Sequence, residues 1–197
     1  ETGTTEEGFY MSWEFLNAFR AEHGYSLESR LADLCASGGD SAAVRHDYFF
    51  TLNRVFTENF SRAVSEWSER HGLKFTGHFL ENKWPLPIGS PSTMAVQQWM
   101  HAPGIDLLGF QFERSGPGGN SLWLLTIKEA TSIAAQCGSR EVLCESGGGG
   151  GYGFGPAEMK PLEDFLLALG ISRFVPHLAH ESLAGIRKYD WPQTLSD

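Results

Sequence analysis

The stretch "REVLCESGGGGGYGFGP", residues 140–156, decides the fold. Its first half is a short apolar run around Leu143 that is typical of a strand, and Glu145 stands where that strand would end. Five consecutive glycines follow, and Pro156 then opens a segment with apolar residues at three- and four-residue steps, which predicts a helix. The stretch therefore predicts a strand, a loop of small residues and a helix in direct succession.

The same alternation of strand and helix extends in both directions along the chain. We expect strands at residues 73–81, 103–112, 140–146 and 172–180. We expect helices at residues 40–71, in a segment that ends near Trp99 and Met100, at residues 122–138 and at residues 155–170. Strands that alternate with helices through short connections predict a parallel sheet with helices packed outside it.

Two parallel architectures fit this alternation, a doubly wound sheet and a (β/α)8 barrel of the TIM type. A complete barrel needs about 250 residues, and four βα units are about half of one. We therefore predict the α/β class with a partial barrel, whose first strands lie upstream of Glu1. In this interpretation the 197 residues form a single domain, with a helical loop region at 1–40 and βα units at 41–197.

The composition excludes several classes of protein. With 41% hydrophobic and 13% aromatic residues, the chain can bury a core and is not a disordered segment. A net charge of -9, without a cluster of Lys and Arg, argues against binding to nucleic acid. No segment approaches the roughly 18 to 20 apolar residues of a membrane helix, so we expect no membrane partner.

Polar residues at predicted strand ends are the candidates for function, because both architectures place working residues at the carboxyl ends of strands. Glu81, Glu145 and His177 stand at or near such ends. Loops that contain Trp84 and Tyr152 follow the first two. Sugars stack their C–H faces on aromatic rings and pair their hydroxyls with carboxylates and imidazoles. The residue types at the strand ends therefore favour a carbohydrate ligand.

The glycine run between Glu145 and Tyr152 suits such a ligand. Glycine has no side chain to keep a ligand away from the backbone, and it tolerates a positive φ angle. Tyr152 and Phe154 then offer flat aromatic faces. A pair of carboxylates across one pocket is what glycosidic-bond hydrolysis needs, because one acts as the acid and the other as the base or nucleophile.

The candidates also have structural interpretations. Glu145 could cap a helix or pair with Arg140 or Lys160. His78 precedes Glu81 by three residues, so the two side chains would point to opposite faces of a regular strand. This geometry favours a structural role for His78 unless a bulge redirects its side chain.

Other features are interpreted as structural. Asp106 stands at the start of its predicted strand, which is the wrong end for chemistry in a barrel. Trp67 and the stripe of Phe49, Phe56 and Phe60 on the long predicted helix are expected in the core. Cys35, Cys137 and Cys144 fit no metal-binding spacing and are read as buried thiols, which leaves the cellular compartment open. The glycine run loosely matches a dinucleotide-binding motif, but the acidic residue just before it would repel a pyrophosphate.

Four segments of the chain together resemble a known family. They are residues 46–82, 102–109, 127–179 and 185–192. Their order and spacing resemble the catalytic barrel of glycoside hydrolases of the α-L-rhamnosidase type, family 106 and its uncharacterised relatives. The resemblance extends from about Trp13 to Pro192.

The resemblance implies a (β/α)8 barrel that hydrolyses a glycosidic bond in plant or microbial polysaccharide. Glu81, which closes "GHFLE", matches an acidic position of the family and would be the general acid. Glu145, in "CES", would be the base or nucleophile. Both roles are expectations that rest on the resemblance.

The resemblance also implies a substrate site and its partners. His78 and His177 match family positions that look like sugar-binding residues, and we expect Trp84 and Tyr152 in the same site. Calcium can assist substrate binding in this group, but we assign no metal ligands in this chain. The expected partners are a carbohydrate substrate and the upstream half-barrel of the same polypeptide. An extracellular or periplasmic location would fit polysaccharide degradation by analogy alone.

Two departures from the family pattern keep other functions open. Members of the family show a strand with an acidic "DEP"-like end before the segment that resembles residues 8–27, and this chain lacks it. The five glycines also replace a more varied loop. The alternatives are a non-catalytic carbohydrate-binding protein, an inactive fragment of a barrel, and a structural or interaction module.

Overall fold

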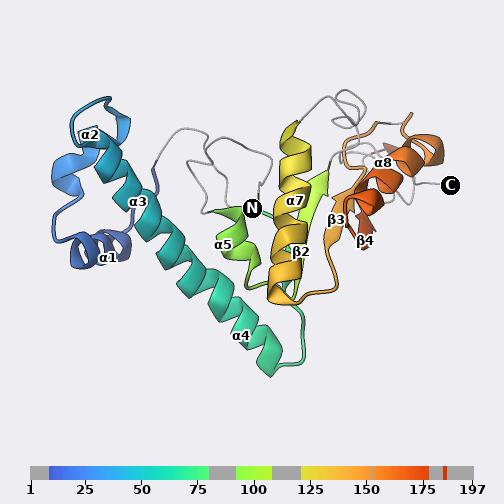
Figure 1. The fold of residues 1–197 in the computed structure, drawn as a ribbon, viewed down its shortest axis with the longest axis horizontal. Helices are drawn as coiled ribbons and strands as arrows, with labels where there is room; N and C mark the ends of the chain where they lie inside the picture. The colour runs from blue at the N-terminus through green and yellow to red at the C-terminus, as the bar shows by residue number, and fades with distance from the viewer. Residues whose placement is uncertain (1–8, 80–91, 108–120, 152, 178–183, 186–197) are drawn as a thin grey trace.

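The computed structural model describes residues 9–79, 92–107, 121–151, 153–177 and 184–185 (Figure 1). Three of the predicted site residues, Glu81, Trp84 and Tyr152, lie outside these ranges. The described chain begins with α1 (Trp13–His23), η1 (Glu28–Arg30) and α2 (Leu31–Cys35). Ser12 starts α1 by accepting a hydrogen bond from the backbone N–H of Phe15, which is the usual role of serine at a helix N-cap.

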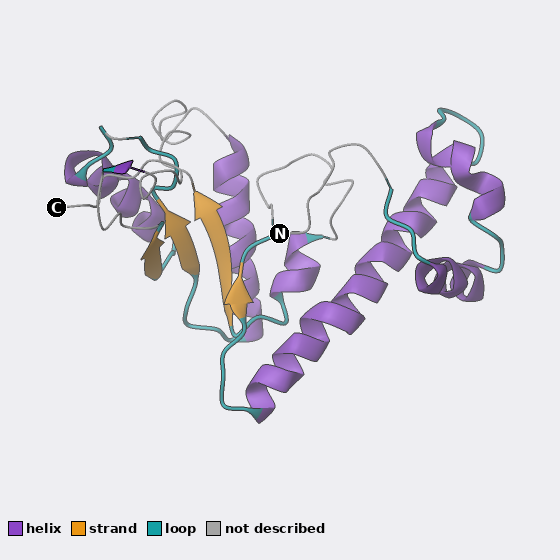
Figure 2. Cartoon of the chain, turned by 180° about the vertical axis from the view of Figure 1, so that it is seen from behind, coloured by secondary structure: helices purple, strands orange, loops and turns teal. Residues whose placement is uncertain are grey.

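A long helix follows and leads from these first helices to the sheet (Figure 2). It consists of α3 (Ser41–Phe56), a π-helical segment η2 (Thr57–Arg62) and α4 (Ala63–Arg70). Asp40 is its N-cap, and Gly72 follows its end with a φ angle of 67°. The helix predicted at residues 40–71 is therefore confirmed, with an unpredicted π-helical segment in its middle.

The first half of this helix packs against α1 and α2. The cluster contains the following buried residues: Phe15, Phe19, Leu27, Leu34, Val44, Tyr48 and Leu52. Beyond Leu52 the helix leaves this cluster, and Phe60 and Trp67 are 40% and 50% exposed. Trp67 stacks on His71 at the surface, with 4.0 Å between ring centroids. The expectation that the whole aromatic stripe is core is wrong for its second half.

Within the described residues, four parallel strands form the sheet. They are β1 (Thr76–Gly77), β2 (Ala102–Leu107), β3 (Leu143–Ser146) and β4 (Arg173–Pro176). They lie in the order β1-β2-β3-β4, which is the order of the sequence. In a doubly wound sheet the spatial order of the strands reverses part-way across the sheet. The order of these four strands shows no such reversal. The α/β class and the parallel sheet are confirmed.

Helices connect the strands, namely α5 (Thr93–Gln97), α7 (Ser121–Cys137) and α8 (Pro156–Ala168). Pro156 occupies the first turn of α8, as predicted. Gly138 and Gly170 follow α7 and α8 with φ angles of 76° and 106°, which a residue with a side chain rarely adopts. Within the described residues, none of the helices has both the length and the apolar character that crossing a membrane requires.

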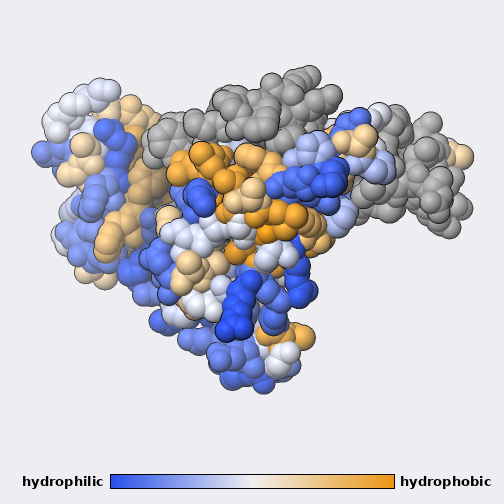
Figure 3. All heavy atoms as spheres, turned by 45° about the vertical axis from the view of Figure 1, so that its right-hand side comes forward, coloured by the Kyte–Doolittle hydropathy of each residue, from blue (hydrophilic) through white to orange (hydrophobic). Residues whose placement is uncertain are grey.

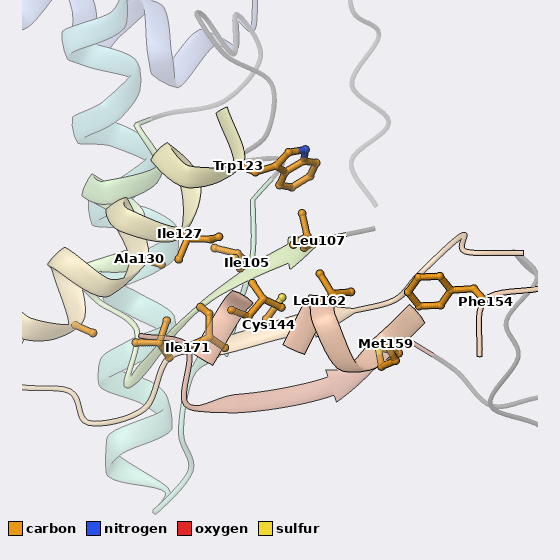
Figure 4. Close-up of a cluster of buried hydrophobic side chains, with 13 residues drawn as sticks. Ile105, Leu107, Trp123, Ile127, Ala130, Cys144, Phe154, Met159, Leu162 and Ile171 are labelled. Carbon is orange, nitrogen blue, oxygen red and sulfur yellow. The ribbon is translucent and has the colours of Figure 1, made fainter. Parts of the chain in front are cut away.

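The two faces of the sheet differ in character. Ile105, Leu107 and Cys144 point to one face, where they pack with side chains of α7 and α8 (Figure 4). Successive residues of a strand point to opposite faces, so Asp106 and Glu145 project from the other one. Val175, the register partner of Glu145 on that face, is 48% exposed. The described helices α7 and α8 therefore cover one face, and the polar side chains belong to the other.

The glycine run accommodates the core beneath it. A Cβ atom on Gly147 would lie 2.4 Å from Cε of Met159, and one on Gly150 would lie 2.4 Å from Cγ of Phe154. Phe154 is only 5% exposed and belongs to the core between the sheet and its helices. The prediction that Phe154 offers a face to a sugar is therefore wrong, because its ring fills space that the glycines leave.

The cysteines also differ from expectation. Cys144 is buried in the core, as predicted, but Cys35 and Cys137 are exposed. Both exposed cysteines are the last residues of their helices, α2 and α7. The last residue of a helix can be exposed even when its position fits the apolar pattern of that helix. The sequence pattern therefore does not distinguish these two cysteines from buried ones.

Candidate active site

Glu145 is the centre of a polar cluster at the carboxyl ends of the strands. It is the third of four residues in β3, and its side chain is 32% exposed. Its neighbours Cys144 and Ser146 are both buried. Because side chains alternate along a strand, the inward direction of these two neighbours aims Glu145 at the face opposite α7 and α8.

Each oxygen of the Glu145 carboxylate faces one imidazole. Nε2 of His78 lies 3.1 Å from Oε2 of Glu145, and Nε2 of His177 lies 3.7 Å from Oε1. An ionised carboxylate only accepts hydrogen bonds, so His78 is the donor when Glu145 is charged. The sequence pattern predicts Glu145 and His177 at neighbouring strand ends, and His78 is added to them only by the family resemblance. The structure brings all three together in space.

The chain holds both histidines by short connections. His78 is the first residue after β1, where Gly77 has a φ angle of 151°. His177 is the first residue after β4, and its backbone N–H donates to the carbonyl of Ser146 at 2.9 Å. The argument for a structural role of His78 assumed a regular strand up to Glu81, and this premise does not apply because β1 ends at Gly77.

The alternative partners proposed for Glu145 are not used. Lys160 pairs with Asp164 at 2.5 Å, one turn further along α8. Arg140 precedes β3 and therefore lies at the opposite end of that strand. Glu145 is thus a member of the histidine cluster rather than a helix cap or a partner of either cation.

Asp106 is the site residue that sequence reasoning missed. The predicted strand 103–112 put it near the start, whereas β2 spans Ala102–Leu107 and makes it the fifth of six residues. It is the register partner of Glu145 on the neighbouring strand. A signal was present in the sequence, because an acidic residue between Ile105 and Leu107 interrupts a run that is otherwise buried.

His78, Asp106 and Glu145 form a compact trio. One ligand atom from each lies within 4.8 Å of the corresponding atoms of the other two. Two carboxylates and an imidazole can exchange protons or hold a divalent cation. Calcium prefers six to eight oxygen ligands, so these residues would supply only part of its coordination.

Comparisons with known proteins concern the fold. No family model matches the chain. No curated protein matches it in sequence. Among solved structures, the fold is similar to part of a rhamnosidase from Novosphingobium sp. PP1Y, with a TM-score of 0.66 and 23% sequence identity. The similarity covers 86% of this chain and 16% of that one. The chain therefore has an α/β fold that is similar to a segment of a rhamnosidase.

Proposed function

We propose that the chain is part of the catalytic domain of a glycoside hydrolase. The observation that carries the proposal is the convergence of Glu145, Asp106 and two histidines at the carboxyl ends of parallel strands. Parallel α/β folds bind their ligands at these ends. The similarity in fold to a segment of a rhamnosidase points in the same direction.

The fold proposed for this domain is a partial (β/α)8 barrel. In such a barrel every strand is parallel to its neighbours, follows the order of the sequence and has its helix on the outside. The order β1-β2-β3-β4 and the position of α7 and α8 on one face agree with this winding. The remaining units would come from an upstream part of the same polypeptide.

The proposed chemistry assigns Glu145 the role of base or nucleophile. Glycosidic hydrolysis needs one ionised carboxylate and one protonated carboxyl group. The imidazoles of His78 and His177 orient the Glu145 carboxylate from both sides. Glu81 remains our candidate for the general acid that protonates the leaving oxygen.

Asp106 has a different role in this proposal. An inverting enzyme keeps its two carboxyl groups about 6.5 to 9.5 Å apart to hold a water between them. Atoms of Asp106 and Glu145 that are within 4.8 Å of each other leave no such room. We therefore assign Asp106 to the orientation of Glu145 and of the substrate, and not to the role of its inverting partner.

The proposed substrate is a glycoside of plant or microbial polysaccharide, with an α-L-rhamnoside as the first candidate. The similarity in fold to a rhamnosidase and the family resemblance are the reasons for choosing rhamnose as the first sugar to test. His78 and His177 would hold sugar hydroxyls, and Trp84 and Tyr152 would stack on the ring.

The test is a rate measurement on the complete gene product that contains this chain. We expect turnover of an aryl α-L-rhamnoside within a panel of aryl glycosides. Glu145→Gln keeps the size of the side chain and removes its charge, so the rate should fall by about a hundredfold or more. The melting temperature should stay unchanged, because Glu145 lies at the edge of the core.

Glu69→Gln is the matched control, because Glu69 is exposed on α4 outside the cluster. Its rate should equal that of the wild type. Full activity of Glu145→Gln would remove Glu145 from the mechanism. Folded protein that binds glycans on an array but turns over no glycoside in the panel would favour the non-catalytic carbohydrate-binding function.

A further inference from the structure

A second site lies at the opposite end of the sheet, where the strands begin. Described residues line a cavity of about 590 Å³ there, and none of them belongs to the candidate active site. Its walls come from Ser65 on α4, from residues 98–101 before β2 and from residues 137–141 between α7 and β3. The volume is within the range of about 300 to 1,000 Å³ that is typical of small-molecule sites.

Positive charge predominates in this cavity. Lys74 and Arg140 line it, and Glu141 is the only carboxylate among the described lining residues. Both oxygens of Glu141 are engaged, one by Nζ of Lys74 at 2.9 Å and the other by Nη2 of Arg173 at 2.7 Å. The hydrogen bond from Lys74 and the charge of Arg173 lower the pKa of Glu141, so this carboxyl group is ionised at neutral pH.

Arg140 therefore adds a positive charge to the cavity that no described carboxylate neutralises. The two positive charges of Lys74 and Arg173 already exceed the single negative charge of Glu141, and Arg140 has no ion-pair partner within the described part of the chain. The complete chain carries a net charge of -9, which makes a local positive excess noteworthy. Figure 3 shows hydrophilic residues over much of the lower part of the molecule, where the long helix ends.

Two further lining residues, Trp99 and His101, carry N–H groups. Nδ1 of His101 accepts from the backbone N–H of Phe75 at 2.9 Å, so the proton of the neutral ring is on Nε2. The indole N–H of Trp99 is buried and has no acceptor among the described residues. A buried donor without an acceptor often marks a water or ligand position.

We propose that this cavity binds a small organic anion through a carboxylate or phosphate group. The guanidinium of Arg140 forms paired hydrogen bonds with either group, and Lys74 adds a second charge. A free inorganic ion would fill little of the 590 Å³, so the proposed anion carries an organic body. The cavity shares no described residue with the candidate active site, so this proposal does not depend on the proposed glycosidase activity.

Cys137 provides a direct reporter of occupancy. Its thiol is exposed and lines the cavity, whereas Cys35 is exposed on α2 outside it. Iodoacetamide is uncharged, so its approach does not depend on the local potential. Mass spectrometry of the complete protein can follow alkylation of both cysteines at constant ionic strength, with glucose 6-phosphate and glucuronate as the two anionic probes.

We expect either probe or both to slow alkylation of Cys137 saturably and to leave Cys35 unchanged. Arg140→Ala should weaken this protection about tenfold or more in probe concentration, since a charge-assisted hydrogen bond is lost. Arg20→Ala is the matched control on α1, and its protection should equal that of the wild type. Because Arg140 has no ion-pair partner in the described residues, circular dichroism should show a folded variant.

Three outcomes would overturn the proposal. Alkylation of Cys137 could be unaffected by both probes, which would leave the cavity without an anion. Neutral glucose at the same concentrations could protect equally, which would make the cavity a site for neutral polyols. Protection could also be the same in Arg140→Ala and Arg20→Ala, which would place the bound anion elsewhere. Protection by only one probe supports the proposal and identifies the carboxylate or the phosphate as the preferred group.

Discussion

Glu145 depends for its orientation on residues that are distant in the sequence. His78 follows β1 and His177 follows β4, and each approaches a different oxygen of the same carboxylate. Only His78 is within hydrogen-bond distance of the carboxylate, at 3.1 Å, whereas His177 is 3.7 Å away. In the proposed function, both histidines would position Glu145 and His78 would do so through a direct hydrogen bond.

Replacement of His78 separates these roles. In His78→Phe the hydrogen bond to Glu145 is lost, and kcat/KM should fall about tenfold to a hundredfold, as expected for a hydrogen bond to a charged group. In His78→Gln an amide N–H can replace the Nε2 donor, and much of the activity should return. Both variants would be assayed on the same aryl glycoside across pH. Equal activities in the two variants would show that the donated hydrogen bond does not matter.

At the scale of single elements, the helices were easier to predict than the strands. Gly138, Gly170 and Pro156 mark the ends of α7 and α8 by local backbone chemistry, which a sequence displays directly. A strand in a parallel sheet ends where its neighbours stop pairing, which no local residue announces. Residues 108–112 of the strand predicted at 103–112 lie outside the described residues. Asp106 is the fifth of the six residues of β2, whereas the prediction puts it near the start of its strand.

The candidate site was predictable from the sequence only where its residues carry a local signal. Glu145 and His177 were found because their types stand out at the ends of apolar runs. The partnership of Glu145 with His78 required the register of three strands, and that of Glu145 with Asp106 required the register of two. Cross-strand neighbours are set by tertiary pairing, so a single sequence does not contain them explicitly.

Substitutions in the glycine loop after β3 test whether its missing side chains make room for Phe154. In Gly150→Ala the new Cβ would meet the ring of Phe154 at 2.4 Å, and we expect a loss of about 1 to 3 kcal/mol in the free energy of unfolding. Gly153→Ala is the matched control, because nothing lies within 4 Å of the added Cβ. Urea unfolding of both variants measures the difference. Equal stabilities would mean that the loop shifts without cost and that the glycines serve another purpose.

At the scale of the whole molecule, the part of the chain that the structure describes contains two hydrophobic clusters. One lies among α1, α2 and α3, and the other lies between the sheet and α7 and α8. The continuous helix α3–η2–α4 extends from the first cluster to the sheet (Figure 2). The stability of the first cluster rests partly on polar contacts between α1 and α3, which link it to pH.

Glu22 on α1 contributes to this pH dependence. Its burial acts to raise its pKa, but hydrogen bonds from Arg54 and Thr51 on α3 outweigh it and lower the pKa below the usual 4.5. A lowered pKa in the folded state stabilises the protein above the unfolded value of 4.5, and this contribution is lost as the pH falls through the lower folded value.

In Glu22→Gln this contribution is absent at every pH. The variant should therefore be less stable than the wild type at neutral pH, and the difference should shrink as the pH falls well below 4.5. Urea unfolding at a series of pH values, monitored by circular dichroism, measures both effects. Glu69→Gln, an exposed replacement on α4, is the control. A difference that is constant across the series would contradict the electrostatic origin.

The π-helical segment η2 sets the rotational phase between the two halves of the molecule. Phe56 is the last residue before this segment and Phe60 lies within it, with 5.1 Å between their ring centroids. Both rings contact the ring of Phe79, which follows β1, at centroid distances of 6.0 and 5.9 Å. Each residue of an α-helix turns the chain by about 100°. Losing one residue from η2 would therefore swing α1 and α2 about a quarter of a turn around the helix axis relative to the sheet. The contacts of Phe56 and Phe60 with Phe79 would be lost in such a rotation, so the number of residues in η2 is tied to these aromatic contacts.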